Sequence, residues 1–184
     1  MMASNILPYD VQAILADSYA DARRNDCLAD RNGAAFRSRY ALPRLTAWFG
    51  DVAYSYSGIF HEPAPFPAIL EGLRQRAEAL SGTSFNAVLA NFYWDGRDSV
   101  GWHSDSEAGL GDCPTIASLP LGGTRRFQFR HRKTKETITL ELKTGHWLMM
   151  AGKIQRCWLH QVPKTTAFVA PRVNVTFRQI MPRS

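Results

Sequence analysis

Residues 91–105 read NFYWDGRDSVGWHSD, a strand-like run and a glycine-containing loop that end in His103-Ser104-Asp105. Side chains two residues apart on an extended chain point to the same side. The pattern therefore predicts that the imidazole of His103 and the carboxylate of Asp105 converge. A second histidine from a distant segment would complete the two-histidine, one-carboxylate set that binds Fe(II) and leaves coordination positions open.

His160 is the candidate for that second histidine, because it lies in the strand-like run Trp158–Val162. A single histidine in such a run is more often structural than a ligand, so His160 alone leaves both interpretations open. A zinc hydrolase would need a metal-bound water and a general base nearby. It would not need the arginine-bearing strand that follows His160.

The segment RVNVTFR at 172–178 alternates strictly between polar and apolar residues. Its polar face carries two arginines and two small hydrogen-bonding residues: Arg172, Asn174, Thr176 and Arg178. Two guanidinium groups suit a dicarboxylate, because each can grip one carboxylate through two hydrogen bonds. The alternative is an ordinary strand whose polar side faces water. The same alternation places Asn91 and Tyr93 together on one face, where both can donate hydrogen bonds to such an acid.

The composition indicates one globular domain, with 184 residues of which 45% are hydrophobic. No run approaches the roughly 20 apolar residues of a membrane span, and the N-terminus shows no secretory signal. Three widely spaced cysteines argue against a zinc or disulfide framework and favour the cytoplasm, with access to the nucleoid if the source is bacterial. The net charge of +6 suits a nucleic-acid partner, or simply a basic enzyme without one. We expect a monomer and no membrane partner.

Helical spacing predicts one helix over roughly 9–25 and another over Ile69–Leu80 that ends at Ser81-Gly82. A first strand is predicted over Leu45–Phe49. Eight further strands follow: Phe85–Tyr93, Trp102–Asp105, Thr115–Leu119, Arg125–Arg130, Thr137–Leu142, Trp147–Met150, Trp158–Val162 and Val173–Ile180. This order predicts an α+β, mainly β chain, a sandwich or jelly roll with helices packed outside. We divide it into an N-terminal helix and polar lid segment over 1–42 and one domain over 43–184.

These motifs resemble those of the AlkB family of Fe(II)- and 2-oxoglutarate-dependent dioxygenases. The resemblance rests on N-x-Y-x-D-G-x-D-x-x-G-x-H-x-D, the distal histidine and R-V-N-V-T-F-R, in this order. It extends to PRLTAWFG at 43–50, YSYSG at 54–58, PTIASL at 114–119 and GTRRF at 123–127. It covers about 43–182 and does not extend over the first 40 residues.

The resemblance implies a double-stranded β-helix in which His103, Asp105 and His160 bind Fe(II) and act in catalysis together with Arg178. It also implies a 2-oxoglutarate site formed by Asn91, Tyr93, Arg172, Asn174, Thr176 and Arg178. The implied reaction uses O₂, converts 2-oxoglutarate to succinate and CO₂, and hydroxylates an N-methyl group on a nucleobase, which then leaves as formaldehyde.

The sequence indicates the residues that contact the substrate less specifically than those for iron and 2-oxoglutarate. An N-methyl group on a base edge is reached in a single strand or a flipped base, held between flat side chains. Trp48, Tyr54 and Tyr56 are candidates for those walls and Arg44 for a polar contact, although Trp48 equally suits the core. The resemblance also implies that Glu107 contacts the base, and Ser106 stands where the family often carries a second aspartate.

A basic cluster surrounds the predicted hairpin after Gly123 and consists of Arg125, Arg126, Arg130, Arg132, Lys133 and Lys135. It would follow a phosphate backbone. For the turn residues Arg132, Lys133 and Lys135, the alternative is a charged edge that deters sheet-to-sheet pairing.

We expect a demethylase of lesions such as 1-methyladenine and 3-methylcytosine in DNA or RNA, with single strands favoured. Two alternatives are considered, of which the first remains open. The same iron and 2-oxoglutarate residues would serve a hydroxylase or demethylase of a protein or a small molecule. A non-catalytic binding module would have no reason to keep both sets of ligands.

Overall fold

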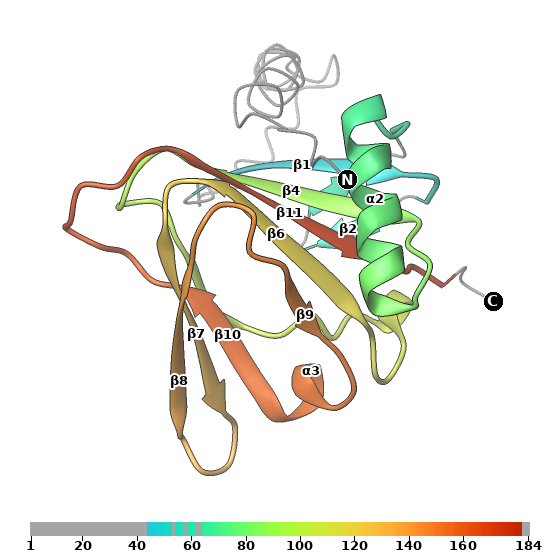
Figure 1. Ribbon diagram of the computed structural model, residues 1–184. Coiled ribbons are helices and arrows are strands. Elements are labelled where there is room, and N and C mark those ends of the chain that lie inside the picture. The colour runs from blue at the N-terminus through green and yellow to red at the C-terminus, as the bar shows by residue number, and fades with distance from the viewer. Residues whose placement is uncertain (1–43, 53, 57–58, 62–63, 182–184) are drawn as a thin grey trace, which may run out of the picture.

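The computed structural model describes residues 44–52, 54–56, 59–61 and 64–181, so the predicted helix over 9–25 and the segment 1–42 lie outside the described residues. The elements follow one another as shown in Figure 1: β1 (Leu45–Gly50), β2 (Tyr54–Tyr56), β3 (Ile59–His61), α2 (Ala68–Ser81), β4 (Ala87–Tyr93), β5 (Val100–His103), η1 (Ala108–Leu110), β6 (Ile116–Gly122), β7 (Arg125–His131), β8 (Thr137–Leu142), β9 (Leu148–Met150), α3 (Ile154–Cys157), β10 (Trp158–Val162) and β11 (Arg172–Arg178).

Two antiparallel sheets form the body of the protein. The larger sheet has the strand order β1-β4-β11-β6-β9, and the smaller has the order β5-β10-β7-β8. From β4 onward the chain passes back and forth between the two sheets, which is the winding of a double-stranded β-helix or jelly roll. The predicted fold class is therefore confirmed, while β2 and β3 form a separate hairpin.

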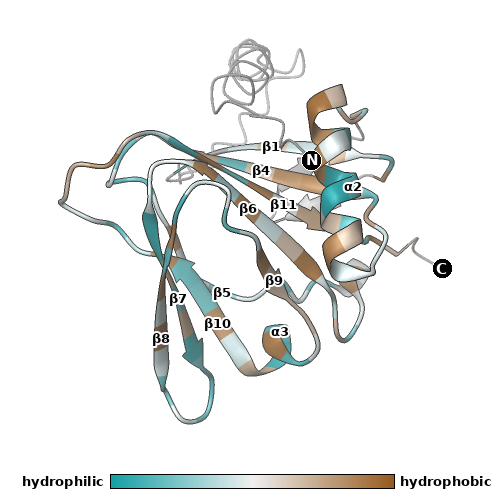
Figure 2. Ribbon diagram, in the orientation of Figure 1, coloured by the Kyte–Doolittle hydropathy of each residue, from teal (hydrophilic) through white to brown (hydrophobic). Residues whose placement is uncertain are grey.

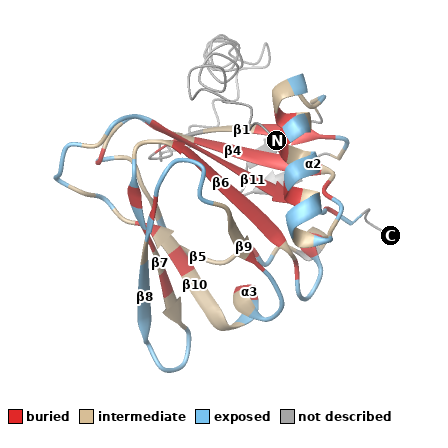
Figure 3. Ribbon diagram, in the orientation of Figure 1, coloured by how far each residue is buried: buried red, intermediate tan, exposed pale blue. Residues whose placement is uncertain are grey.

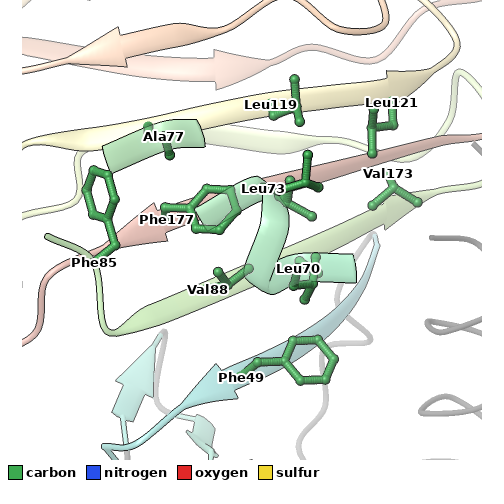
Figure 4. Packing of buried hydrophobic residues seen from close by; sticks show 13 residues of the cluster. Phe49, Leu70, Leu73, Ala77, Phe85, Val88, Leu119, Leu121, Val173 and Phe177 are labelled. Carbon is green, nitrogen blue, oxygen red and sulfur yellow. The ribbon is translucent and has the colours of Figure 1, made fainter. Parts of the chain in front are cut away.

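Helix α2 covers the outer face of the larger sheet. Its residues Leu70, Leu73 and Ala77 recur at helical spacing and are buried against apolar side chains of the sheet, as Figure 4 shows. The helix ends at Gly82, whose left-handed φ of 67° suits glycine and whose N–H donates to the carbonyl of Glu78. The predicted helix over Ile69–Leu80 is thus confirmed.

Alternation along β11 separates the core from the interior between the sheets. Val173, Val175 and Phe177 belong to the cluster beneath α2, so the polar residues of the strand point inward. Figure 3 shows β4, β6 and β11 as the most buried strands and β8 as exposed. Figure 2 shows hydrophobic residues along the strands beneath α2 and a hydrophilic turn between β7 and β8.

The eight predicted strands after residue 85 are all present, with shifted ends. The largest functional difference is at β5, which ends at His103 and leaves Asp105 on the following loop. The elements β3, η1 and α3 were not predicted, because three- and four-residue elements are too short to show a periodicity. No helix among the described residues is long and apolar enough to cross a membrane.

Candidate active site

His103 and His160 are direct partners across the antiparallel pair of β5 and β10. Their ring centroids lie 4.2 Å apart. Asp105 joins them from the loop after β5, and the three side chains offer ligand atoms that all lie within 4.8 Å of one another. The predicted convergence is confirmed, although β5 ends at His103 and Asp105 lies on the loop that follows, not within the predicted strand.

Each of the two imidazoles can present one ring nitrogen to a metal ion. Nδ1 of His103 lies 2.8 Å from the carbonyl oxygen of Gly101, a contact in which Nδ1 must be the donor. Nε2 of His103 is the ring nitrogen that this contact leaves for a metal, and it lies 3.9 Å from Oδ1 of Asp105. Burial lowers the pKa of His160 to about 4, so this ring is neutral near pH 7. Neutral imidazole is the form that binds metals.

Asp105 completes the set as a buried carboxylate. Its Oδ2 accepts a hydrogen bond from Nη2 of Arg178 at 3.1 Å, whereas its Oδ1 has no hydrogen-bond partner among the residues that the structure describes. Burial alone would raise the pKa of Asp105, but the charge of Arg178 and the two imidazoles outweigh it and hold the pKa below its usual range. An ionised buried oxygen facing two imidazole rings fits a divalent cation, and this donor set suits Fe(II).

A cavity between the two sheets opens beside these ligands. The polar residues that line it come from the inner face of the larger sheet and the segment before it: Arg44, Asn91, Tyr93, Ser118, Asn174, Thr176 and Arg178. All seven residues of β11 are buried, which rules out the alternative that its polar side faces water. The structure thus places five of the six predicted 2-oxoglutarate residues around the cavity that the ligands share.

Arg172, the sixth, is fully buried but does not line the cavity. Its Nη2 donates to Oδ1 of Asn174 at 2.8 Å and its Nη1 to the carbonyl of Leu142 at 3.2 Å. Burial lowers the pKa of Arg172 to about 10, which still leaves a full charge near pH 7. Arg172 therefore supplies a buried positive charge directly behind Asn174.

Ser118 and Phe127 are among the cavity-lining residues that were not predicted. The hydroxyl of Ser118 accepts a hydrogen bond from Nδ2 of Asn174 at 2.9 Å, and the ring of Phe127 stacks on His160 with centroids 5.4 Å apart. The alternation of β6 could have indicated Ser118, because it is the polar residue between the outward-facing Ala117 and Leu119. Phe127 carried no such signal, since inward-facing aromatic residues are common in sheets.

The structure places the predicted substrate residues in different environments. Arg44 is buried, lines the cavity and donates from Nε to Oδ1 of Asn91 at 2.7 Å. Trp48 is buried in a cluster with Leu89 and donates to the carbonyl of Val52, so the structure favours the core interpretation over a stacking wall. Burial on the inner face of β1 removes the exposed ring face that stacking requires.

The other candidate substrate residues lie elsewhere. Tyr54 and Tyr56 belong to β2, but the placement of their side chains lies outside the described residues. Ser106 is exposed and Glu107 half-buried on the loop after Asp105, and neither lines the cavity. Oε2 of Glu107 is buried and has no hydrogen-bond partner in the described part of the chain.

The basic cluster divides into two groups. Arg125 is buried and donates to the carbonyls of Asp95, Asp98 and Pro163, so it is a structural residue and not a phosphate contact. The remaining members stay on or near the surface, where Arg130 lies over the ring of Trp102.

The exposed members include one that contacts the metal-ligand loop. Nη2 of Arg132 donates to the hydroxyl of Ser104 at 2.6 Å. The hairpin of β7 and β8 thereby lies next to the loop that carries Asp105.

Comparison with known proteins agrees with this geometry. The family model described as the 2OG-Fe(II) oxygenase superfamily matches residues 6–178. Alpha-ketoglutarate-dependent dioxygenase alkB homolog 3 from Mus musculus is 44% identical over 153 residues, covering 78% of this chain and 54% of the relative. The Homo sapiens protein of that name is 42% identical over 162 residues, covering 83% and 57%.

Two further comparisons extend this result. DNA oxidative demethylase ALKBH2 from Mus musculus is 39% identical over 157 residues, covering 80% of this chain and 66% of the relative. A solved structure described as "The structure of OsALKBH1" superposes with a TM-score of 0.58 at 19% identity, over 75% of this chain and 79% of that chain, and supports the fold alone. The chain spans about half the length of the alkB homolog 3 proteins that it matches.

Proposed function

This chain belongs to the 2OG-Fe(II) oxygenase superfamily, among its AlkB-type members, and from this membership we propose that it removes N-methyl groups from nucleobases by oxidation. The observation that carries the proposal is the grouping of His103, Asp105 and His160 beside a cavity lined by buried hydrogen-bond donors. These three residues would hold Fe(II). When bound, the metal supplies the activation of O₂ that couples 2-oxoglutarate decarboxylation to hydroxylation.

The protein's own residues would bind and orient the cosubstrate. A dicarboxylate inside the barrel must have its charges compensated, because an unpaired buried carboxylate is very costly. Arg178 beside the metal ligands and Arg172 behind Asn174 supply positive charge. Asn91, Tyr93, Asn174 and Thr176 would supply neutral hydrogen bonds, and Ser118 orients the amide of Asn174.

Nucleic acid is the substrate class that the comparisons favour. The ALKBH2 relatives are named DNA oxidative demethylases, and the chain carries a net charge of +6. The exposed residues Arg132, Lys133 and Lys135 on the β7–β8 turn offer a site for phosphates close to the metal-ligand loop. We propose a monomer that acts on single strands, in which no duplex opening is needed.

A direct assay tests the proposal. Formaldehyde release would be measured with single-stranded DNA, duplex DNA and RNA, each carrying 1-methyladenine or 3-methylcytosine, with Fe(II) and 2-oxoglutarate present. We expect turnover by the wild-type protein and none by His103→Ala. His146→Ala is the matched control, because this exposed histidine lies outside the metal group and should leave turnover unchanged.

Two outcomes would contradict the proposal. Turnover that persists in His103→Ala or without iron would exclude the metal site as its source. Absence of turnover on every oligonucleotide, together with 2-oxoglutarate-dependent turnover of a peptide or a small molecule, would favour the alternative substrate class.

A further inference from the structure

We propose that Gln155 is a positioning residue that holds the metal ligand Asp105 in place and thereby raises the affinity of the site for its metal. The inference rests on the metal site of the proposed function and not on the choice of substrate. It concerns a residue that no motif singled out and that lies on the short helix α3, outside the cavity lining.

The three candidate ligands are not held by the chain in the same way. His103 and His160 face each other in the ladder of β5 and β10, so backbone hydrogen bonds fix their relative position. Asp105 lies two residues beyond the end of β5, where no ladder continues. Its position must therefore be set by contacts from outside its own strand.

Gln155 provides such a contact. The backbone N–H of Asp105 donates to Oε1 of Gln155 at 3.0 Å, and both residues are buried, with 1% of each exposed. Nε2 of Gln155 points the other way, to the sulfur of Met150 at 3.7 Å. This contact fixes the orientation of the Gln155 amide, because only its oxygen, and not its NH₂ group, can accept a hydrogen bond from a backbone N–H.

The hydrogen bonds of Asp105 leave one of its two carboxylate oxygens for a metal. Gln155 holds its N–H, and Arg178 holds Oδ2. Oδ1 is then the oxygen that faces Nε2 of His103. A carboxylate held at its backbone and at one oxygen needs little rearrangement when the other oxygen binds a cation, and outer hydrogen bonds of this kind support metal affinity.

The same segment also carries the third ligand. Helix α3 ends at Cys157 and continues directly into β10, where His160 follows. Gln155 and His160 are five positions apart, so one short stretch of chain both supplies a ligand and supports another. Its displacement would disturb Asp105 and His160 together.

A simpler role is possible for any buried glutamine, namely that it stabilises the core without affecting the metal. The two roles differ in what they change. A purely structural residue alters the free energy of unfolding of the metal-free protein but leaves the metal affinity of the folded protein unchanged. If Gln155 is a positioning residue, loss of its acceptor oxygen lowers the metal affinity of the folded protein.

The experiment compares three variants of the full chain. Gln155→Met keeps the length and approximate volume of the side chain but replaces the amide oxygen by a thioether, which is a much weaker acceptor. Gln155→Glu keeps an oxygen acceptor and adds negative charge. Ile154→Val is the matched control, because it removes one methylene group from the neighbouring partly buried residue and keeps the glutamine that bonds to Asp105. Thermal melting of the metal-free proteins first establishes that each variant is folded.

Metal affinity is then measured by titration with Co(II), without substrate, and the visible absorption bands of the bound ion report its geometry. We expect Gln155→Met to bind Co(II) about 10- to 100-fold more weakly than wild type, with shifted bands. Gln155→Glu should bind at least as tightly as wild type, and Ile154→Val should be unchanged.

The results test the positioning role of Gln155 separately from the proposed demethylase function. Wild-type affinity and spectrum in Gln155→Met would overturn the positioning role, as would equal weakening in Gln155→Glu. A wild-type protein that binds no Co(II) would contradict the proposed function and this inference together. The expected Co(II) pattern without activity on methylated oligonucleotides would leave the inference intact and refute the substrate proposal.

Discussion

Replacing Arg125 by leucine should destabilise the protein without weakening its attraction to phosphates. The guanidinium of Arg125 is buried and donates to the carbonyls of Asp95 at 2.9 Å and of Asp98 and Pro163 at 2.8 Å each. It also lies over the ring of Tyr93, with 5.7 Å to the centroid. One side chain thereby ties the loop after β4 to the loop after β10, next to a cavity-lining residue.

The size of the loss follows from these contacts. A hydrogen bond to a charged group contributes about 1.5–3 kcal/mol. The three bonds share one guanidinium and are not additive, and water can reach part of the freed carbonyls on the loops. We therefore expect Arg125→Leu to lower the free energy of unfolding by about 3–5 kcal/mol, comparable to breaking a buried charged contact. For a chain of this size the melting temperature should fall by roughly 6–20 °C.

Equilibrium unfolding in urea measures this loss, with Arg126→Ala as the matched control. Arg126 is the exposed neighbour on the same strand, and its removal should change the free energy of unfolding by less than about 0.5 kcal/mol. The salt dependence of oligonucleotide binding should be the same for Arg125→Leu as for wild type. A loss below about 1 kcal/mol, or a clear fall in the salt slope, would refute the structural role of Arg125.

Three further outcomes are expected. Phe177→Ala removes a fully buried ring beneath α2 and should cost about 3–5 kcal/mol in urea unfolding, and a cost below 1 kcal/mol would contradict its place in the core. Co(II) at about 100 times its Kd should stabilise the wild-type protein by about 2.7 kcal/mol in thermal melts, and this gain should vanish on chelation or in His160→Ala. Arg172→Leu should weaken 2-oxoglutarate binding by roughly 10-fold or more, measured by calorimetry with the metal present, because the charged hydrogen bond that holds Oδ1 of Asn174 is lost together with the positive charge behind it; unchanged affinity would show that Arg172 does not support the cosubstrate site.

The inward or outward direction of side chains could be predicted from the sequence wherever a strand was long enough. Alternation along 172–178 correctly separated the α2 face from the cavity face, because covalent geometry sends successive side chains to opposite sides. Seven residues of strict alternation permit few other arrangements. The polar face of β11 was therefore a sound prediction before any tertiary contact was known.

Burial of single residues could not be predicted in the same way. Trp48 and Arg125 belong to residue types that are common both on nucleic-acid surfaces and in structural roles. What decides between these roles is the element on the opposite side: Leu89 for Trp48, and the carbonyls of two loops for Arg125. Those neighbours come from distant parts of the chain and leave no local pattern.

The metal site combines both kinds of information. The sequence by itself determined the ligand types and the pairing of a near H-x-D with a far histidine, because only certain side chains can bind Fe(II). The tertiary structure alone decided that Asp105 leaves the strand and that Gln155, fifty residues away, holds its backbone. A hydrogen bond across that separation depends on how the two sheets and α3 pack together. It therefore exists only in the folded protein and has no signature in the sequence around either residue.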